Sequence, residues 1–414
     1  MAFFGFSSVL PLLLVLGTLG FWLREAGVDL KTIGFMSWIG LIYGLKWSWA
    51  PLVDRLPIPI LIHWLGQRRS WLLVAQLGVM LGLFATAFAD PQINLGILAV
   101  STVGTAFASA TQDIALDAYR IESADSRHQA AYAAMYQAGY RMGMIWAGAG
   151  ALAFAAWAAG DTSGYLHSAW GVSYSVMAMS MSVGIVTTLF APEPSAKEQR
   201  VQTVKKMPFW QRTKAAIVEP FTLFFHRFGW SALLVLVLIA TYRISDVVMG
   251  IMANPFYQDI GFSKEQVAAV SKVFGVVMTL LGAFIGGVAT MRYGVLKMLM
   301  LGAVLSAATN VLFSMLAQIG ASLPLLIAAV SADNLAAFVA YLSGLTTRGC
   351  SATQYALFSS LMLLLPKFLA GFSGILVELV GYSNFFLITA AIGVPVVGLV
   401  MLVMRWVPES ADET

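Results

Sequence analysis

The stretch ATQDIALDAYR, residues 110–120, places three ionisable side chains at the end of the uncharged run 93–109. Asp113, Asp117 and Arg120 are spaced by four and three residues, so in a helix they share one face. Asp117 can pair with Arg120, whereas Asp113 has no obvious partner on its own helix. A carboxylic acid removed from water holds its proton more readily and can exchange it near neutral pH. We therefore predict proton coupling at Asp113 and Asp117, with Asp113 as the first candidate.

A second interpretation of Asp113 is structural. Its carboxylate could pair with Lys46 or Arg141 and hold helices together, because an ionisable group inside a membrane span costs roughly 2.5–3.5 kcal/mol and needs a partner. Asp117 and Arg120 could likewise form a latch at the cytoplasmic end of their helix. The sequence leaves both interpretations open.

Cations that stand beside aromatic residues on a helix face indicate a cavity for an anionic, ring-bearing solute. Lys46 and Arg141 are the two cations of this kind in the first half. The predicted solute-binding residues of this half are Tyr43, Lys46, Trp47, Gln112, Tyr136, Tyr140 and Arg141.

Further polar residues occur inside the apolar runs of the second half. Those expected to bind the solute are Arg243, Asp246, Lys272, Asp333, Asn334 and Lys367. Arg243 and Asp246 are three residues apart and are expected to neutralise each other. Asn254 and Pro255 are expected to break their helix and to contribute to an outer gate.

The elements that must position these residues are membrane helices. Only 11% of the 414 residues are charged and 59% are hydrophobic, whereas soluble domains are about 25% charged. A bilayer core needs roughly 20 apolar residues per helix, and runs such as GILAVSTVGTAFASA lack the alternation of a membrane β-barrel. We predict an all-α integral membrane protein with twelve transmembrane helices in two pseudo-symmetric six-helix halves, the major facilitator fold. The spans are expected near 3–23, 33–53, 70–89, 93–117, 135–159, 168–191, 229–250, 264–290, 295–316, 321–346, 354–380 and 383–405.

One long polar interval divides the chain. We expect an N-terminal six-helix bundle at 1–191, a cytoplasmic linker with an interfacial helix at 192–228, and a C-terminal six-helix bundle at 229–414. Twelve spans place both termini on one side of the membrane. Most lysines and arginines then lie on that side, and of those outside the spans only Arg24, Lys31 and Lys264 lie opposite. The positive-inside rule therefore puts both termini in the cytoplasm.

The residue content excludes several function classes. The single Cys350 allows neither an intrachain disulfide nor a cysteine-based metal site, and the four histidines form no ligand pattern. The sequence contains no phosphate-binding loop and no nucleophile elbow. The net charge of +4 reflects membrane topology and contact with anionic lipid rather than a nucleic-acid partner. We expect no enzyme activity and no cofactor, and transport driven by protons or by the solute's own gradient.

Several stretches resemble the AmpG-like muropeptide permeases of the major facilitator superfamily: DLKTIGF at 29–35, APLVDR at 50–55 with GQRR at 66–69, ATQDIALDAYR at 110–120, GYRMGM at 139–144 and SATQYALFSSL at 351–361. The APLVDR and GQRR pair is similar to the family-wide loop between the second and third spans. The resemblance implies a cytoplasmic gate whose side chains cap helix ends, here Asp54, Arg55, Arg68, Arg69 and Arg120. The insertion LPIPILIHWL at 56–65 lengthens this loop.

AmpG-like permeases commonly carry further C-terminal spans, whereas this chain has twelve predicted spans. In that form it resembles the related siderophore permeases of the RhtX/FptX type. This resemblance implies an importer that carries a pyochelin-like ferric siderophore through the bacterial inner membrane, from periplasm to cytoplasm. We expect proton-driven uptake by a monomer. Such a ligand would suit Lys46, Arg141 and their aromatic neighbours, which could bind it through charge pairing and ring stacking. Iron would arrive inside the ligand, so no protein metal site is expected.

Two alternatives stay open. A muropeptide importer would bind a sugar–peptide solute, which would favour more asparagine and glutamine in the cavity than the sequence offers. A membrane receptor or scaffold would move nothing, and it would have no reason to bear the cost of charges inside the spans of both halves.

Overall fold

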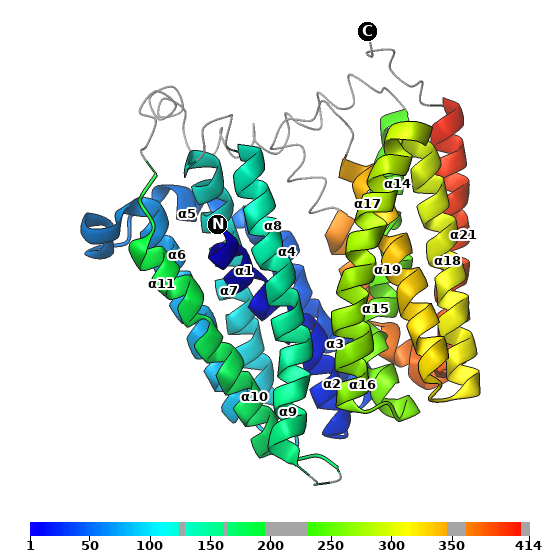
Figure 1. The fold of residues 1–414 in the computed structure, drawn as a ribbon, viewed down its shortest axis with the longest axis horizontal. Helices are drawn as coiled ribbons and strands as arrows, with labels where there is room; N and C mark the ends of the chain where they lie inside the picture. The colour runs from blue at the N-terminus through cyan, green and yellow to red at the C-terminus, as the bar shows by residue number, and fades with distance from the viewer. Residues whose placement is uncertain (124–128, 161, 163, 195–230, 346–361, 407–414) are drawn as a thin grey trace. The chain divides into compact units, whose positions relative to one another are not determined.

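The computed structural model describes residues 1–123, 129–160, 162, 164–194, 231–345 and 362–406. The regular structure in this part of the chain is helical (Figure 1). Nine of the described helices are long and apolar enough to cross a membrane. The predicted all-α membrane fold is therefore confirmed. The three other predicted spans are a repeatedly interrupted helix near 33–53, the helix near 321–346, whose apolar described part is Leu323–Ala336, and the span 354–380, which begins outside the described residues.

Contacts within the chain define two compact units, which are described separately. The first consists of Met1–Glu198 with Ile251–Val276, and the second of Gln199–Gly250 with Val277–Thr414. The bundle boundaries 1–191 and 229–414 stay a prediction. So does the interfacial helix of the linker 192–228, most of which lies outside the described residues.

The helices that lie wholly or largely in the first unit follow the chain in order. They are α1 (Ala2–Leu13), η1 (Leu14–Thr18), α2 (Leu19–Glu25), α3 (Leu30–Met36), η2 (Ser37–Gly40), α4 (Leu41–Leu45), η3 (Lys46–Ser48), α5 (Ala50–Arg55), α6 (Leu61–Phe88), α7 (Leu95–Ser123), α8 (Gln129–Ile145), η4 (Trp146–Gly150), α9 (Ala151–Ala159), α10 (His167–Ser180), α11 (Ser182–Phe190), α15 (Ile244–Ile260), α16 (Lys264–Val267) and η5 (Ala268–Phe274). The segments η1, η4 and η5 are π-helical, whereas η2 and η3 are 3₁₀-helical.

The second unit contains α14 (Ser231–Thr241), the start of α15, α17 (Gly275–Tyr293), α18 (Val295–Ile319), α19 (Leu323–Leu345) and α21 (Ser373–Trp406). The helix α18 packs along both α19 and α21 (Figure 1). Gly381 adopts a left-handed conformation with φ 77°, which a glycine reaches without a side-chain clash. The kink at Gly381 lies between the predicted spans 354–380 and 383–405, and α21 runs through both sides of it.

The second predicted span, 33–53, is not one continuous helix but the series α3, η2, α4, η3 and α5. Leu45 and Trp49, which flank η3, have ψ near zero, so the α-helical hydrogen-bond pattern does not pass through this point. Pro51 follows in the first turn of α5, where its missing N–H has no helical acceptor to lose. As a result, Lys46 lies in a tight turn rather than in a regular helix.

The helix break expected at Asn254 and Pro255 is wrong. The helix α15 continues through Pro255 to Ile260, and the interruption lies earlier, at residues 242–243 between α14 and α15. The proline ring packs beside Gly20 of α2, where a Cβ would make an ordinary contact of 3.6 Å with the proline Cδ. The segment 56–65, expected as a lengthened loop, is also partly helical, since α6 begins at Leu61 and passes through a kink at Gly66.

Glycines set the distance between α1 and α8. A Cβ on Gly5 would lie 2.0 Å from the carbonyl oxygen of Tyr136, and one on Gly139 would lie 1.8 Å from that of Ala2. Gly143 makes a similar close approach to Phe6. The glycines at 139 and 143 form the small-xxx-small spacing that lets membrane helices approach backbone to backbone. Only glycine fits at this contact, which brings the polar residues of α1 and α8 together.

Replacing Gly139 by alanine should therefore destabilise the protein by about 1–3 kcal/mol, because the new methyl group cannot avoid the α1 backbone. The measurement is the thermal midpoint of the purified protein in detergent. Gly104→Ala is the matched control, since a methyl group on this α7 glycine would have no neighbouring atom within 4 Å. Equal midpoints for the two variants would contradict the close glycine packing of α1 and α8.

Candidate proton and solute site

The polar face predicted for residues 110–120 is present on α7. Asp117 and Arg120 form the expected ion pair, with 3.4 Å between Oδ1 and Nη2. Asp113 lies further along the same face and is the less accessible carboxylate, with 24% of its side chain exposed against 53% for Asp117. The opposite face of α7 is buried by apolar packing, in which Ala115 and Leu116 meet Leu72 of α6. Packing therefore fixes which way the carboxylates point.

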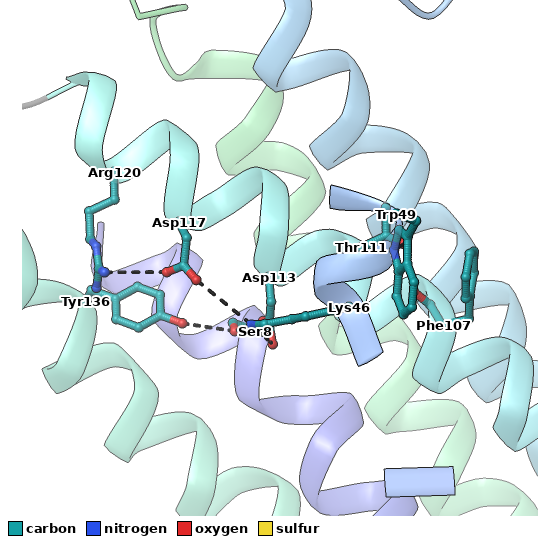
Figure 2. A network of polar contacts seen from close by, with 9 residues as sticks. All are labelled: Ser8, Lys46, Trp49, Phe107, Thr111, Asp113, Asp117, Arg120 and Tyr136. Carbon is teal, nitrogen blue, oxygen red and sulfur yellow. Dashed lines mark hydrogen bonds and ion pairs between the residues drawn. The ribbon is translucent and has the colours of Figure 1, made fainter. Parts of the chain in front are cut away.

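Lys46 lies between the two carboxylates. Its Nζ is 4.0 Å from Asp113 Oδ2 and 4.0 Å from Asp117 Oδ2 (Figure 2). The helix break at η3 brings this ammonium to α7 from a neighbouring element. The structural pairing of Asp113 with Lys46 is thus present, and an equal distance to two acids leaves the ammonium free to favour either one.

Ser8 and Tyr136 complete the surroundings of Asp113. The Ser8 hydroxyl donates to Asp113 Oδ1 at 2.8 Å, and the Tyr136 hydroxyl donates to Ser8 Oγ at 3.0 Å (Figure 2). The guanidinium of Arg120 lies 5.4 Å from the centre of the Tyr136 ring. Tyr136 was predicted to contact solute, whereas Ser8 was not predicted at all. No sequence signal distinguishes Ser8 from Ser7, whose hydroxyl donates to its own helix at Phe4.

An aromatic pair lies beside this network on the side of η3. The Trp49 indole donates to Thr111 Oγ1 at 3.2 Å and stacks on Phe107 with 4.9 Å between ring centres (Figure 2). Trp47, which the sequence predicts to bind the solute, is 40% exposed, and its solute contact stays a prediction. The local break in the helix turns Trp49 rather than Trp47 toward α7.

The other predicted residues of the first unit occupy different environments. Tyr43 is buried beside Val15 and Ala110. Gln112 is fully buried, and neither atom of its amide has a hydrogen-bond partner among the described residues. Tyr140 packs near Tyr136, with 6.1 Å between ring centres.

Arg141 and Lys272 complete the predicted residues of this unit. Arg141 donates to the sulfur of Met144 at 3.6 Å. Lys272, in η5, donates to Asn254 Oδ1 at 2.9 Å.

Arg68 and Arg69 of α6, two of the predicted gate residues, contact the ends of α7 and α11. Arg68 makes a two-pronged contact with Glu122, at 2.9 and 2.6 Å. Arg69 donates to the carbonyls of Thr188 and Leu189 at the end of α11, at 2.8 and 2.5 Å. The gate role that the family resemblance implies for Arg68, Arg69 and Arg120 stays a prediction.

Glu193 binds the backbone of α6 at the same place. It accepts the backbone N–H groups of Arg68 and Arg69 at 2.8 and 3.2 Å, next to the kink at Gly66. Neither Glu122 nor Glu193 was predicted from the sequence. The side chains of Asp54 and Arg55 lie outside the described residues, so the gate role of these two residues stays a prediction.

In the second unit, Arg243 and Asp246 form no direct ion pair, and their mutual neutralisation stays a prediction. Asp246 accepts a hydrogen bond from Ser306, and no ion pair of the described residues joins Arg243 to Asp246. The spacing rule fails because α15 begins at Ile244, so Arg243 precedes the helix. In α19, Asn334 accepts a hydrogen bond from Thr279 at 2.7 Å. Asp333 and Lys367 are partly buried.

Metal binding finds no support in the described part of the chain, where no three His, Cys, Asp or Glu side chains are grouped to hold an ion. What the first unit offers instead is a group of one ammonium, two carboxylates and two hydroxyl groups beside the candidate membrane helix α7. Such a group can bind a proton and an anion, because protonation of a carboxylate releases the ammonium from it.

The chain is similar to bacterial permeases over nearly its full length. It is 34% identical to the anhydromuropeptide permease of Escherichia coli, over 97% of this chain and 78% of that protein. It is 32% identical to a Rickettsia conorii protein named as an AmpG 4 transporter, over 96% of this chain and 94% of that protein. No protein-family model matches the chain. These relatives give no support to the siderophore permeases and favour the muropeptide alternative.

Solved structures show the same fold at low sequence identity. The nucleoside transporter NupG superposes with a TM-score of 0.71 at 14% identity, covering 97% of this chain and 98% of that one. The xylose transporter XylE from Escherichia coli gives 0.72 at 10% identity, covering 100% and 97%. The chain therefore has the predicted transporter fold. Its shorter length does not separate it from AmpG proteins, because the Rickettsia relative is matched over 94% of its length.

Replacing Lys46 by methionine should destabilise the protein by about 1–3 kcal/mol, because Asp113 loses its counter-ion within the membrane. The double variant Lys46→Met with Asp113→Asn should recover most of that loss, since both charges are removed. Thermal midpoints in detergent measure both effects. Arg120→Met is the control and should change the midpoint little, because the pair it breaks is more exposed. A wild-type midpoint for Lys46→Met would show that the pair does not stabilise the fold.

Proposed function

The chain belongs to the AmpG family of membrane permeases, and we propose that it imports an anhydromuropeptide-like solute, a sugar carrying a short acidic peptide, together with protons. The observation that carries the choice of solute is the 34% identity to the Escherichia coli anhydromuropeptide permease over 97% of the chain. The observation that carries the coupling is the contact of Lys46 with Asp113 and Asp117.

The chemistry of such a solute fits the candidate site. A muropeptide bears carboxylates, which a lysine ammonium binds, and hydroxyl and amide groups, which serine and tyrosine hydroxyls can bind. Lys46, Ser8 and Tyr136 supply these groups next to one another. The stacked indole of Trp49 adds a flat apolar surface for the face of a sugar ring.

In the proposed cycle, Lys46 neutralises Asp113 and Asp117 while the site is empty. A proton that binds an oxygen of Asp113 removes its charge and weakens its attraction for the ammonium. Lys46 can then pair with a carboxylate of the solute. After the solute leaves, the ammonium returns to Asp113, and the proton is released. Because each step favours the next, a proton and an anionic group of the solute travel together.

We also propose that the protein lies in the bacterial inner membrane with both termini in the cytoplasm. The distribution of lysine and arginine between the loops supports this orientation. The sequence resembles the AmpG permeases, and its relatives are named as such permeases. Both observations support a location in the inner membrane. Import of a ferric siderophore, which the resemblance to siderophore permeases implied, is not retained as the main function.

Asp113→Asn should abolish gradient-driven accumulation of anhydromuropeptide in proteoliposomes, because asparagine cannot carry the proton. Exchange of labelled for unlabelled solute at zero gradient should persist, since asparagine keeps the size and hydrogen-bonding capacity of the side chain. Asp117→Asn makes the same chemical change on the same helix at a more exposed position, and it should lower accumulation less than Asp113→Asn does. Wild-type accumulation by Asp113→Asn at equal protein amounts would remove Asp113 from the coupling.

The same liposomes test the solute. Unlabelled anhydromuropeptide should compete with labelled anhydromuropeptide for uptake by the wild-type protein, whereas ferric pyochelin should not. Uptake of ferric pyochelin without uptake of anhydromuropeptide would overturn the proposed function in favour of the siderophore importer.

A further inference from the structure

Lys272 is a second cation at membrane depth, and its surroundings differ from those of Lys46. It lies in the π-helical segment η5, two turns into the span that begins at Lys264. A charge at this depth needs a partner or a cavity. Two other cations of the first unit have acidic partners: Arg24 pairs with Asp259, and Lys264 with Glu25.

The hydrogen-bond partner of Lys272 is neutral. Its Nζ donates to Asn254 Oδ1 at 2.9 Å. Among the ion pairs of the described residues, none includes Lys272. An ammonium has three N–H donors, and one contact with an amide oxygen leaves two of them available and the charge uncompensated.

The contact is held in a fixed orientation. The Asn254 amide nitrogen donates to the carbonyl of Gly17 in η1 at 2.9 Å, so the amide oxygen must point toward Lys272. Asn254 is only 7% exposed, which favours keeping both hydrogen bonds. The position of the ammonium is thus set by a buried amide and not by a mobile surface group.

The stem of Lys272 is also held. A Cβ on Gly148, in the π-helical segment η4, would lie 3.2 Å from Lys272 Cδ, so this glycine leaves just enough room for the stem. Thr18 ties η1 to η4 by donating to the carbonyl of Ala147 at 3.3 Å. Three π-helical segments therefore meet around Lys272, and such segments occur often at functional sites.

The outer end of the same helix is anchored as well. Lys264 Nζ lies 2.8 Å from Glu25 Oε1, and both side chains are nearly buried. Ser263 and Gln266 form a capping box that fixes the start of α16. These contacts fix the depth of η5 against α2. Lys272 itself keeps some exposed surface, so a solute group can reach it.

We propose that Lys272 and Asn254 form an anion subsite that binds a carboxylate of the transported solute. This inference rests on the proposed function, because it takes the solute to be a carboxylate-bearing molecule. The subsite is separate from the proton site in its chemistry: it has an ammonium with a neutral amide, whereas Lys46 has two carboxylates. Binding at Lys272 therefore requires no proton transfer and serves affinity rather than coupling.

The test measures the binding of two forms of anhydromuropeptide to the purified full chain, one with free peptide carboxylates and one with those carboxylates amidated. Lys272→Gln should weaken binding of the acid form by about tenfold or more, as expected for loss of a charged contact. It should leave binding of the amidated form unchanged. Lys272→Arg should retain the preference for the acid, and Lys297→Gln, at an exposed lysine, is the matched control. Equal effects of Lys272→Gln on both forms, or no effect, would overturn the subsite.

A second probe separates this proposal from the proposed function. N-acetylglutamate should raise the thermal midpoint of the wild-type protein but not that of Lys272→Gln, and its diamide should raise neither. If anhydromuropeptide does not bind but N-acetylglutamate gives this pattern, the solute assignment falls and the subsite stands. If anhydromuropeptide binds the wild type and Lys272→Gln equally well, the subsite falls and the proposed function stands.

Discussion

The need to compensate the Asp113 carboxylate inside the membrane shapes the first unit. Three elements meet at this side chain: α1 supplies the Ser8 hydroxyl, η3 supplies the Lys46 ammonium, and α8 supplies Tyr136 behind Ser8. The position of each of these side chains depends on a local feature of the backbone. The glycine contacts bring α1 against α8, and the interrupted second span turns Lys46 toward α7. A straight second helix or a bulkier α8 would leave the carboxylate without these partners.

The arrangement also explains how one site can serve stability and transport. An ion pair that only held helices together would be expected to have one short, well-defined contact. Lys46 instead lies 4.0 Å from each of two carboxylates, and one of these also has Arg120 as a partner. Such a cation can change partners at small cost, because the two positions differ little in distance. The structural and the coupling interpretations of Asp113 are therefore compatible.

Much of the fold could be predicted from the sequence, because apolar runs of the length of a bilayer crossing and the face shared by Asp113, Asp117 and Arg120 follow from composition and helical period. The interruption near Lys46 and the unbroken helix at Pro255 could not. Both are local features of the backbone, and the periodicity of apolar residues does not reveal them. The same limit applies to the site. Ser8 resembles Ser7 in sequence, and only the packing of α1 decides that one hydroxyl bonds its own helix while the other reaches Asp113. The siderophore resemblance finds no support among the relatives, and chain length does not separate the chain from AmpG proteins, since a Rickettsia relative is matched over 94% of its length.

The most direct measurement of the central claim is the pH inside proteoliposomes that contain the wild-type protein, after anhydromuropeptide is added outside with no imposed gradient. We expect the interior to become more acidic as the solute enters, because a proton accompanies it. Entry of the solute with no change in the interior pH would contradict proton coupling at Asp113.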